Sequence, residues 1–82
     1  MLLARIIDEN KQQNVVGGNV KKFRLKAGLS QKQLSERLET EAVYVCRGSV
    51  SRIETGERTV TDIEIVGLAK ILNVSIESLF KA

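Results

Sequence analysis

The most constraining stretch of this sequence is the run GSVSRIETGERT over residues 48–59. Val50 and Ile53 are three residues apart, which places them on one buried stripe of a short helix. Gly56 follows where glycine readily ends a helix in the left-handed conformation. The other side of the helix carries small or cationic side chains: Arg47, Ser49 and Arg52. A helix this short is not stable alone, so neighbouring helices must hold it.

The distribution of charge supports a polyanionic partner. The net charge is +3, and residues 17–37 hold one acid, Glu36, against six cations: Lys21, Lys22, Arg24, Lys26, Lys32 and Arg37. A basic first half suits a surface that faces DNA, whereas the simpler alternative is a solvated helix face. A packed helix with a small, hydrogen-bonding and cationic outer side also fits the major groove.

Composition favours one small helical domain and excludes several kinds of site. The chain has 82 residues, no proline and no tryptophan, so its core must be mainly aliphatic. Cys46 is the only cysteine and there is no histidine, which excludes an intramolecular disulfide, a zinc site and histidine-based catalysis. We therefore expect no metal, no cofactor and no enzymatic activity, and we expect a cytoplasmic location.

Residues 1–14 form an N-terminal extension that differs from the rest of the chain. Its four aliphatic residues have helical spacing, although a short strand would also accommodate them: Leu2, Leu3, Ile6 and Ile7. Arg5 interrupts this stretch, which is too short and too charged for a signal peptide or a membrane span. Residues 11–14 resemble a polar linker, and Gly17-Gly18 should break the chain before the first helix of the domain.

Capping signals divide the remaining chain into five helices. The first should span about Asn19 to Ala27, with Gly28 as its C-terminal cap. Two capping boxes, Ser30-Gln31-Lys32-Gln33 and Thr61-Asp62-Ile63-Glu64, should open helices that end near Thr40 and Leu72. Between these two helices, the third should run from about Arg47 to Thr55. Ser75 should cap the last helix. The connection from residue 40 to 46 carries Ala42, Val43 and Val45 and should pack as a turn.

This order of elements resembles the lambda repressor/Cro-type helix-turn-helix family, also called the xenobiotic response element family. The likeness extends over about Val16 to Lys81 and depends on the following residues: Arg24, Gly28-Leu29-Ser30-Gln31, Leu34 to Leu38, Val50 to Glu54, Gly56, and Leu68-Ala69-Lys70 to Phe80. It implies an all-α, five-helix DNA-binding domain over residues 15–82. One departure is a connection about five residues longer than usual between Leu38 and Val50, as in a subgroup of the family.

The resemblance also implies roles for individual residues. The third helix would contact DNA bases through Arg47, Gly48, Ser49 and Arg52. Phosphate contacts would come from Gln31, Lys32, Thr55, Arg58 and Thr59. Gln31 would in addition brace Arg47, and Arg24 would form a largely buried ion pair with Glu54. Cys46 stands where a serine-like cap is usual, and we expect a structural or weakly capping thiol.

These observations predict a sequence-specific transcriptional regulator that binds double-stranded DNA and represses by occupying a promoter. One helix-turn-helix unit contacts few base pairs, so we expect a homodimer, formed in solution or only on DNA. The N-terminal extension could serve either this self-association or the bracing of its own domain. The alternative function is an antitoxin-type interaction module that binds a partner protein and also regulates its own expression.

Overall fold

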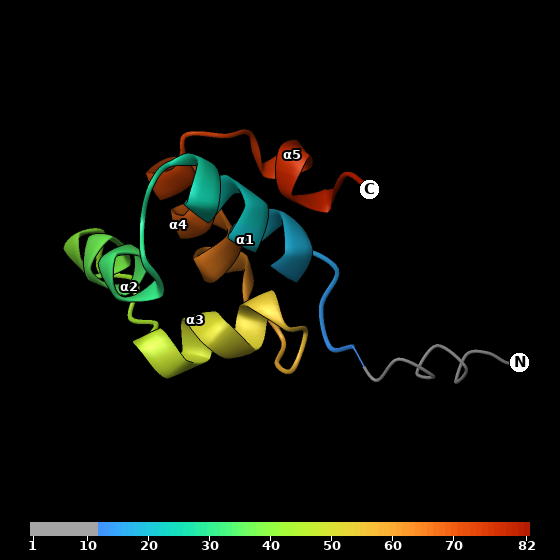
Figure 1. Cartoon of the computed structure of the whole chain (residues 1–82), viewed down its shortest axis with the longest axis horizontal. Helices are drawn as coiled ribbons and strands as arrows, with labels where there is room; N and C mark the ends of the chain where they lie inside the picture. Colours follow the sequence, from blue (N-terminus) through green and yellow to red (C-terminus); the bar gives the residue numbers. More distant parts are fainter. Residues whose placement is uncertain (1–11) are drawn as a thin grey trace, which may run out of the picture.

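The computed structural model describes residues 12–82, and these residues fold into five α-helices without a strand (Figure 1). The helices are α1 (Gly17–Lys26), α2 (Gln31–Thr40), α3 (Arg47–Glu54), α4 (Asp62–Leu72) and α5 (Ile76–Phe80). The predicted all-α fold of five helices is confirmed. None of the helices in this part of the chain has the length and apolar character needed to cross a membrane.

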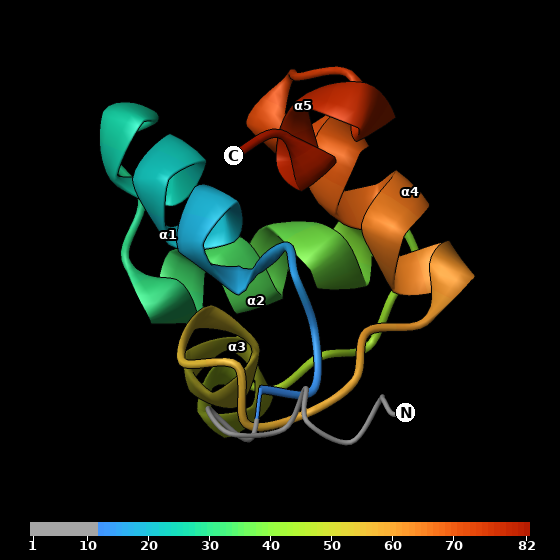
Figure 2. The ribbon, with the colours of Figure 1, turned by 90° about the vertical axis from the view of Figure 1, so that its right-hand side faces the viewer.

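The helices are arranged so that α3 lies at one edge of the molecule. α1 and α2 both pack against α3, while α4 packs against α1, α2 and α5 (Figures 1 and 2). The core between them is almost entirely aliphatic and consists of Val16, Val20, Leu29, Leu34, Leu38, Val43, Val45, Val50, Ile53, Leu68, Ala69, Leu72 and Leu79. Because only one side of α3 contacts this core, its other side remains open to solvent.

The start of α1 differs from the prediction, because the helix includes Gly17 and Gly18 instead of beginning at Asn19. The side-chain oxygen of Asn14 accepts hydrogen bonds from the backbone N–H groups of Val16, at 3.1 Å, and Gly17, at 2.7 Å. A Cβ atom on Gly17 would overlap the carbonyl oxygen of Ile53 in α3. Glycine therefore permits close contact between two helices here and does not break the chain.

The predicted caps Ser30, Thr61 and Ser75 are confirmed, whereas the side chain of Cys46 makes no capping hydrogen bond at the start of α3. Ser30 and Gln33 form one capping box and Thr61 and Glu64 form the other, each with both reciprocal hydrogen bonds. Four helices end beside a residue with positive φ, where a left-handed residue lets the backbone turn away: Gly28 (φ 73°), Ala42 (φ 61°), Gly56 (φ 79°) and Asn73 (φ 57°). Local hydrogen bonding therefore sets most of the helix limits.

The longer connection between α2 and α3 packs against the domain. Val43 and Val45 are buried, and the hydroxyl of Ser35 donates a hydrogen bond to the Val45 carbonyl at 2.6 Å. Ala42, also expected to pack, is instead exposed and has a φ of 61°. The connection therefore enters α3 at a fixed position, because both of its buried valines are held.

Candidate nucleic-acid interface

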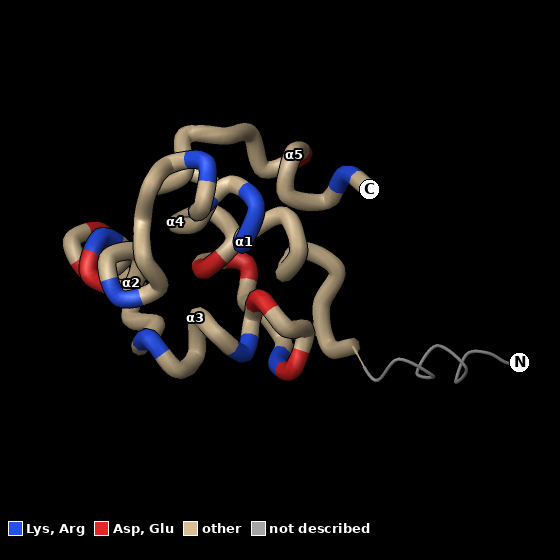
Figure 3. The backbone as a smooth tube through the Cα atoms, in the orientation of Figure 1, with Lys and Arg blue, Asp and Glu red and all other residues tan. Residues whose placement is uncertain are grey.

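α3 has one buried side and one solvent-facing side. Val50 and Ile53 are each 1% exposed, whereas Arg47, Gly48 and Arg52 are exposed and Ser49 is half-buried. In the backbone view, Lys and Arg positions recur along α3 and at the start of α2 (Figure 3). The structure thus brings the four residues expected to contact bases onto one accessible helix.

A buried ion pair fixes the C-terminal end of α3 to α1. The Arg24 guanidinium donates from Nε to Glu54 Oε2 at 2.6 Å and from Nη2 to Glu54 Oε1 at 3.1 Å. Its third hydrogen bond, from Nη1, reaches the Leu29 carbonyl at 2.8 Å. The contact between Arg24 and Glu54 agrees with the sequence expectation. Because two parallel hydrogen bonds constrain orientation as well as distance, this pair sets the angle at which α3 leaves the core.

Gln31 donates a hydrogen bond to Glu54 and lines the same hollow as Arg47, the residue that it was expected to brace. Its side-chain N–H group donates to Glu54 Oε1 at 3.0 Å. The carboxylate provides the acceptor that this N–H group needs, while the amide oxygen of Gln31 can still accept a hydrogen bond from a guanidinium. The Gln31 amide therefore joins the start of α2 to the same carboxylate that holds α1 and α3.

An open hollow of about 540 Å³ lies between the starts of α2 and α3. It is lined by Arg24, Ser30, Gln31, Lys32 and Arg47. The first backbone N–H groups of α2 have no partner within their own helix, and the helix dipole makes this end favourable for an anion. Lys32 and Arg47 are both exposed at this hollow, so a phosphate group could meet two cations and a helix N-terminus together.

Cys46 occupies the N-cap position of α3, where its Sγ atom lies 3.5 Å from the hydroxyl oxygen of Ser49. That hydroxyl, followed by the backbone N–H of the same residue, lowers the pKa of the Cys46 thiol. Arg52 Nη2 donates to the Ser49 hydroxyl at 3.1 Å. Ser49 therefore links the start of the helix to an arginine one turn later, on the exposed side.

Gly48 has no evident structural requirement for glycine. A Cβ atom there would meet only Arg52 Nη1, at an ordinary contact distance of 3.6 Å, and its φ is not positive. Glycine nevertheless lowers helix stability by up to about 1 kcal/mol relative to alanine. The fold alone does not explain this residue, whereas close approach to a ligand at the surface of α3 would.

Arg58 is held by an acid that the sequence analysis assigned only to a cap. Its guanidinium makes two hydrogen bonds of 2.9 Å to Glu64, which also closes the capping box of α4. The hydrogen bond from Arg58 lowers the pKa of Glu64, and the same contact raises the pKa of Arg58. The other two residues expected beside the glycine turn, Thr55 and Thr59, are exposed.

Asn14 is a structural residue that the sequence analysis placed in a linker. Its side-chain N–H group donates to the carbonyl oxygens of Ile53, at 3.1 Å, and Arg58, at 2.8 Å. The backbone N–H of Gln13 donates to the Gly56 carbonyl at 2.7 Å. These contacts attach the chain before α1 to the turn after α3 (Figure 2). An asparagine three residues before a helix start was the available sequence signal.

Comparison with known families agrees with this geometry. The sequence profile of the helix-turn-helix family matches residues 20–79, which is more than half of the chain. The chain belongs to this family, in its lambda repressor/Cro-like form, and is a DNA-binding helix-turn-helix regulator. A search of curated proteins gave no match.

Proposed function

We propose that this protein recognises specific DNA sequences by inserting α3 into the major groove and that it represses transcription by occupying promoter DNA. The observation that carries this proposal is that one side of α3 is held rigidly by the domain while its other side is accessible. Glu54 accepts hydrogen bonds from Arg24 and Gln31, while Arg47 and Arg52 remain exposed. A fixed helix with exposed arginines can distinguish bases because its backbone loses little conformational freedom on binding.

Base contacts would come from the exposed side of α3. Arg47 and Arg52 can each donate two hydrogen bonds to O6 and N7 of a guanine, the commonest specific contact in the major groove. Ser49 can donate to or accept from either kind of base, and it already orients Arg52 through a 3.1 Å hydrogen bond. Gly48 would let the backbone approach the DNA closely, which accounts for a glycine that the fold does not need.

Phosphate contacts would flank this helix on both sides. Gln31 and Lys32 lie at the hollow beside the start of α2, and Thr55 and Thr59 are exposed around the turn after α3. Arg58 would contribute while it keeps its ion pair with Glu64, since a guanidinium has five N–H donors. Contacts of this kind set the position of the helix on the duplex without specifying sequence.

We further propose that two copies act together on paired half-sites, because one unit contacts few base pairs. This dimer would form in solution or on DNA, and the protein would act in the cytoplasm. The expected dimer contact was the N-terminal extension, residues 1–14, of which residues 1–11 lie outside the described residues.

Selection of bound sequences from a pool of random duplexes tests the proposed function. The full chain should enrich one motif with guanines at fixed positions, and a dimer should enrich that motif as two repeats. Enrichment of no sequence, with binding that depends only on salt, would contradict specific recognition.

A further inference from the structure

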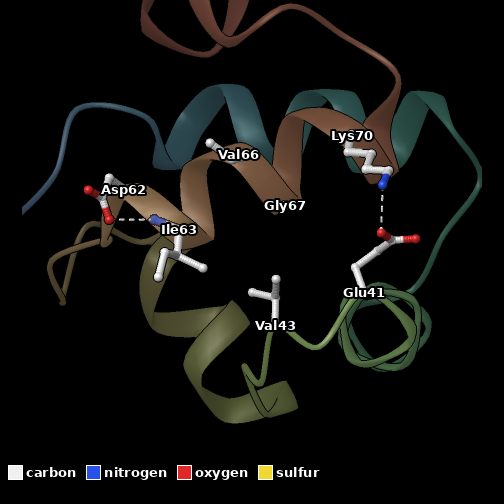
Figure 4. A pocket seen from close by; sticks show the side chains of 7 residues that line it. All are labelled: Glu41, Val43, Asp62, Ile63, Val66, Gly67 and Lys70. Carbon is white, nitrogen blue, oxygen red and sulfur yellow. Dashed lines mark hydrogen bonds and ion pairs between the residues drawn. The ribbon is translucent and has the colours of Figure 1, made fainter.

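An apolar groove lies on α4, away from the exposed side of α3. Its volume is about 470 Å³, and it is lined by Glu41, Val43, Asp62, Ile63, Val66, Gly67 and Lys70 (Figure 4). Ile63 is 67% exposed and Val66 is 53% exposed, one helical turn apart on α4. These two large aliphatic side chains join the apolar lining of the groove into one contiguous surface, the kind that another segment can cover.

The floor of the groove is set by a glycine and by the long connection between α2 and α3. A Cβ atom on Gly67 would lie 2.9 Å from Val43 Cγ2 and 3.3 Å from Leu38 Cδ2, so glycine allows α4 to pack closely on this connection. Figure 4 shows Ile63 on α4 and Val43 on the connection, with their side chains on opposite sides of the groove. The groove is therefore a built feature of the packing between these two elements.

The two ends of the groove are polar. At one end, Lys70 Nζ lies 2.7 Å from Glu41 Oε1, so that the two charges compensate each other. At the other end, the carboxylate of Asp62 accepts a hydrogen bond from the backbone N–H of Ile63 at 2.7 Å and is exposed. An occupant should therefore be aliphatic along its length and could place a cation near Asp62.

The described chain begins close to a path that leads to this groove. The side chain of Gln12 lies against Gly56, and Gln13 is hydrogen-bonded to the carbonyl of the same glycine. From Gly56, the five residues 57–61 carry the chain to Asp62 at the edge of the groove. The four residues 8–11 separate Gln12 from Ile7. Residues 8–11 are therefore nearly as long as residues 57–61 and can span nearly the same distance, from beside Gly56 to the edge of the groove at Asp62.

We propose that the N-terminal segment, residues 1–7, docks into this groove of its own chain. Its aliphatic residues would cover Ile63 and Val66, and they have the composition that the groove requires: Leu2, Leu3, Ile6 and Ile7. Arg5, the only cation among these seven side chains, would lie near Asp62. The short tether favours docking within one molecule, because it keeps the segment at an effective concentration in the millimolar range, about that of short flexible linkers.

Limited digestion with trypsin tests the docking, because cleavage after Arg5 requires this segment to be accessible. Val66→Asp should speed this cleavage by about tenfold, the change expected when the accessible state becomes tenfold more populated. The matched control is Leu25→Asp, since Leu25 is 59% exposed on α1 and does not line the groove. It should leave the cleavage rate unchanged. Equal rates in the wild type and both variants, with equal denaturant midpoints, would overturn the proposal.

A disulfide experiment identifies the occupant. In a Cys46→Ser background with oxidised glutathione added as the oxidant, Ile6→Cys combined with Val66→Cys should form a disulfide within one molecule, at a rate independent of protein concentration. The control pair is Ile6→Cys with Leu25→Cys, which should form this bond at least about tenfold more slowly because its effective concentration is lower. Equal rates for the two pairs would overturn docking. A disulfide-linked dimer would overturn docking within one chain and would make a second copy the occupant.

Discussion

α3 and α4 each expose one side, but the chemistry of the two exposed sides is opposite. α3 presents Arg47 and Arg52 and is held from behind by the carboxylate of Glu54. α4 presents Ile63 and Val66 above an apolar floor. A polar exposed side on a rigid helix suits a polyanion, whereas an aliphatic one suits a protein segment. The two exposed sides of this small domain therefore suit occupants of different chemistry.

The largest expected effect concerns how α3 is held. Glu54→Ala should reduce the free energy of unfolding by about 3–5 kcal/mol, because it leaves the buried guanidinium of Arg24 without its partner. The matched control on the α4 side is Glu41→Ala, which removes the more exposed pair with Lys70 and should cost about 0–1 kcal/mol. Denaturant unfolding measures both. Similar losses would show that the two regions are held in the same way.

The close packing of α3 against α1 can be tested with two neighbouring glycines of α1. Gly17→Ala should destabilise the fold by about 1–3 kcal/mol, because the added carbon would overlap the Ile53 carbonyl oxygen and force the helices apart. Gly18→Ala is the control, since nothing lies within 4 Å of its added carbon, and it should stabilise α1 by up to about 1 kcal/mol. Thermal or denaturant unfolding gives both values. Two changes of the same sign would contradict this account of α1.

The ion pair between Arg58 and Glu64 joins the turn after α3 to the start of α4, and it should be sensitive to acid. The pKa of Glu64 is lower in the folded protein than its ordinary value, so its contribution is present above about pH 4.3 and is lost as the pH falls through the folded pKa. Glu64→Gln keeps a capping side chain but removes the charge.

This variant should be less stable than the wild type by about 1 kcal/mol at pH 7, and the difference should shrink as the pH falls below about 4.3 and through the folded pKa of Glu64. The free energy of unfolding, measured across this range, checks the prediction. A difference that persists unchanged at low pH would show that the charge on Glu64 is not what stabilises the fold.

The smallest expected change in stability is at Gly48. Gly48→Ala should leave the fold unchanged or stabilise it by up to about 1 kcal/mol, because its added carbon has open space. The same variant should bind the selected DNA more weakly, because the helix can no longer approach as closely. Unfolding and DNA titration of one sample separate the two effects. Unimpaired binding would remove the proposed role of this glycine.

The sequence predicts best those features that depend on neighbouring residues. Both capping boxes and the left-handed residue at Gly56 follow from side chains within a few positions, and the structure has them. The contact between Arg24 and Glu54 was predicted from the family resemblance. The residues next to each of them in the sequence would not predict it. This contact depends on packing between residues 30 positions apart.

The features that were missed depend on distant contacts. Gly17 was interpreted as a chain break. The atom that requires glycine there, the carbonyl oxygen of Ile53, belongs to another helix and cannot be inferred from neighbouring residues. Asn14 was placed in a linker for the same reason, as its two carbonyl partners lie 39 and 44 residues away. Glu64 both caps α4 and binds Arg58. The second role could not be predicted without knowing that the Arg58 side chain reaches α4.

DNA titration of Arg47→Ala tests the central claim, that the exposed side of α3 recognises sequence, most directly. The control is Lys81→Ala, which removes the same charge directly after α5, a helix that lies across the molecule from α3 (Figure 1). On the duplex selected by the wild type, Arg47→Ala should lose about 1–3 kcal/mol of binding free energy and lose preference at one or two base positions. Lys81→Ala should keep the preference at every position. If Arg47→Ala retains both the affinity and the preferred sequence, α3 does not recognise DNA in the way proposed.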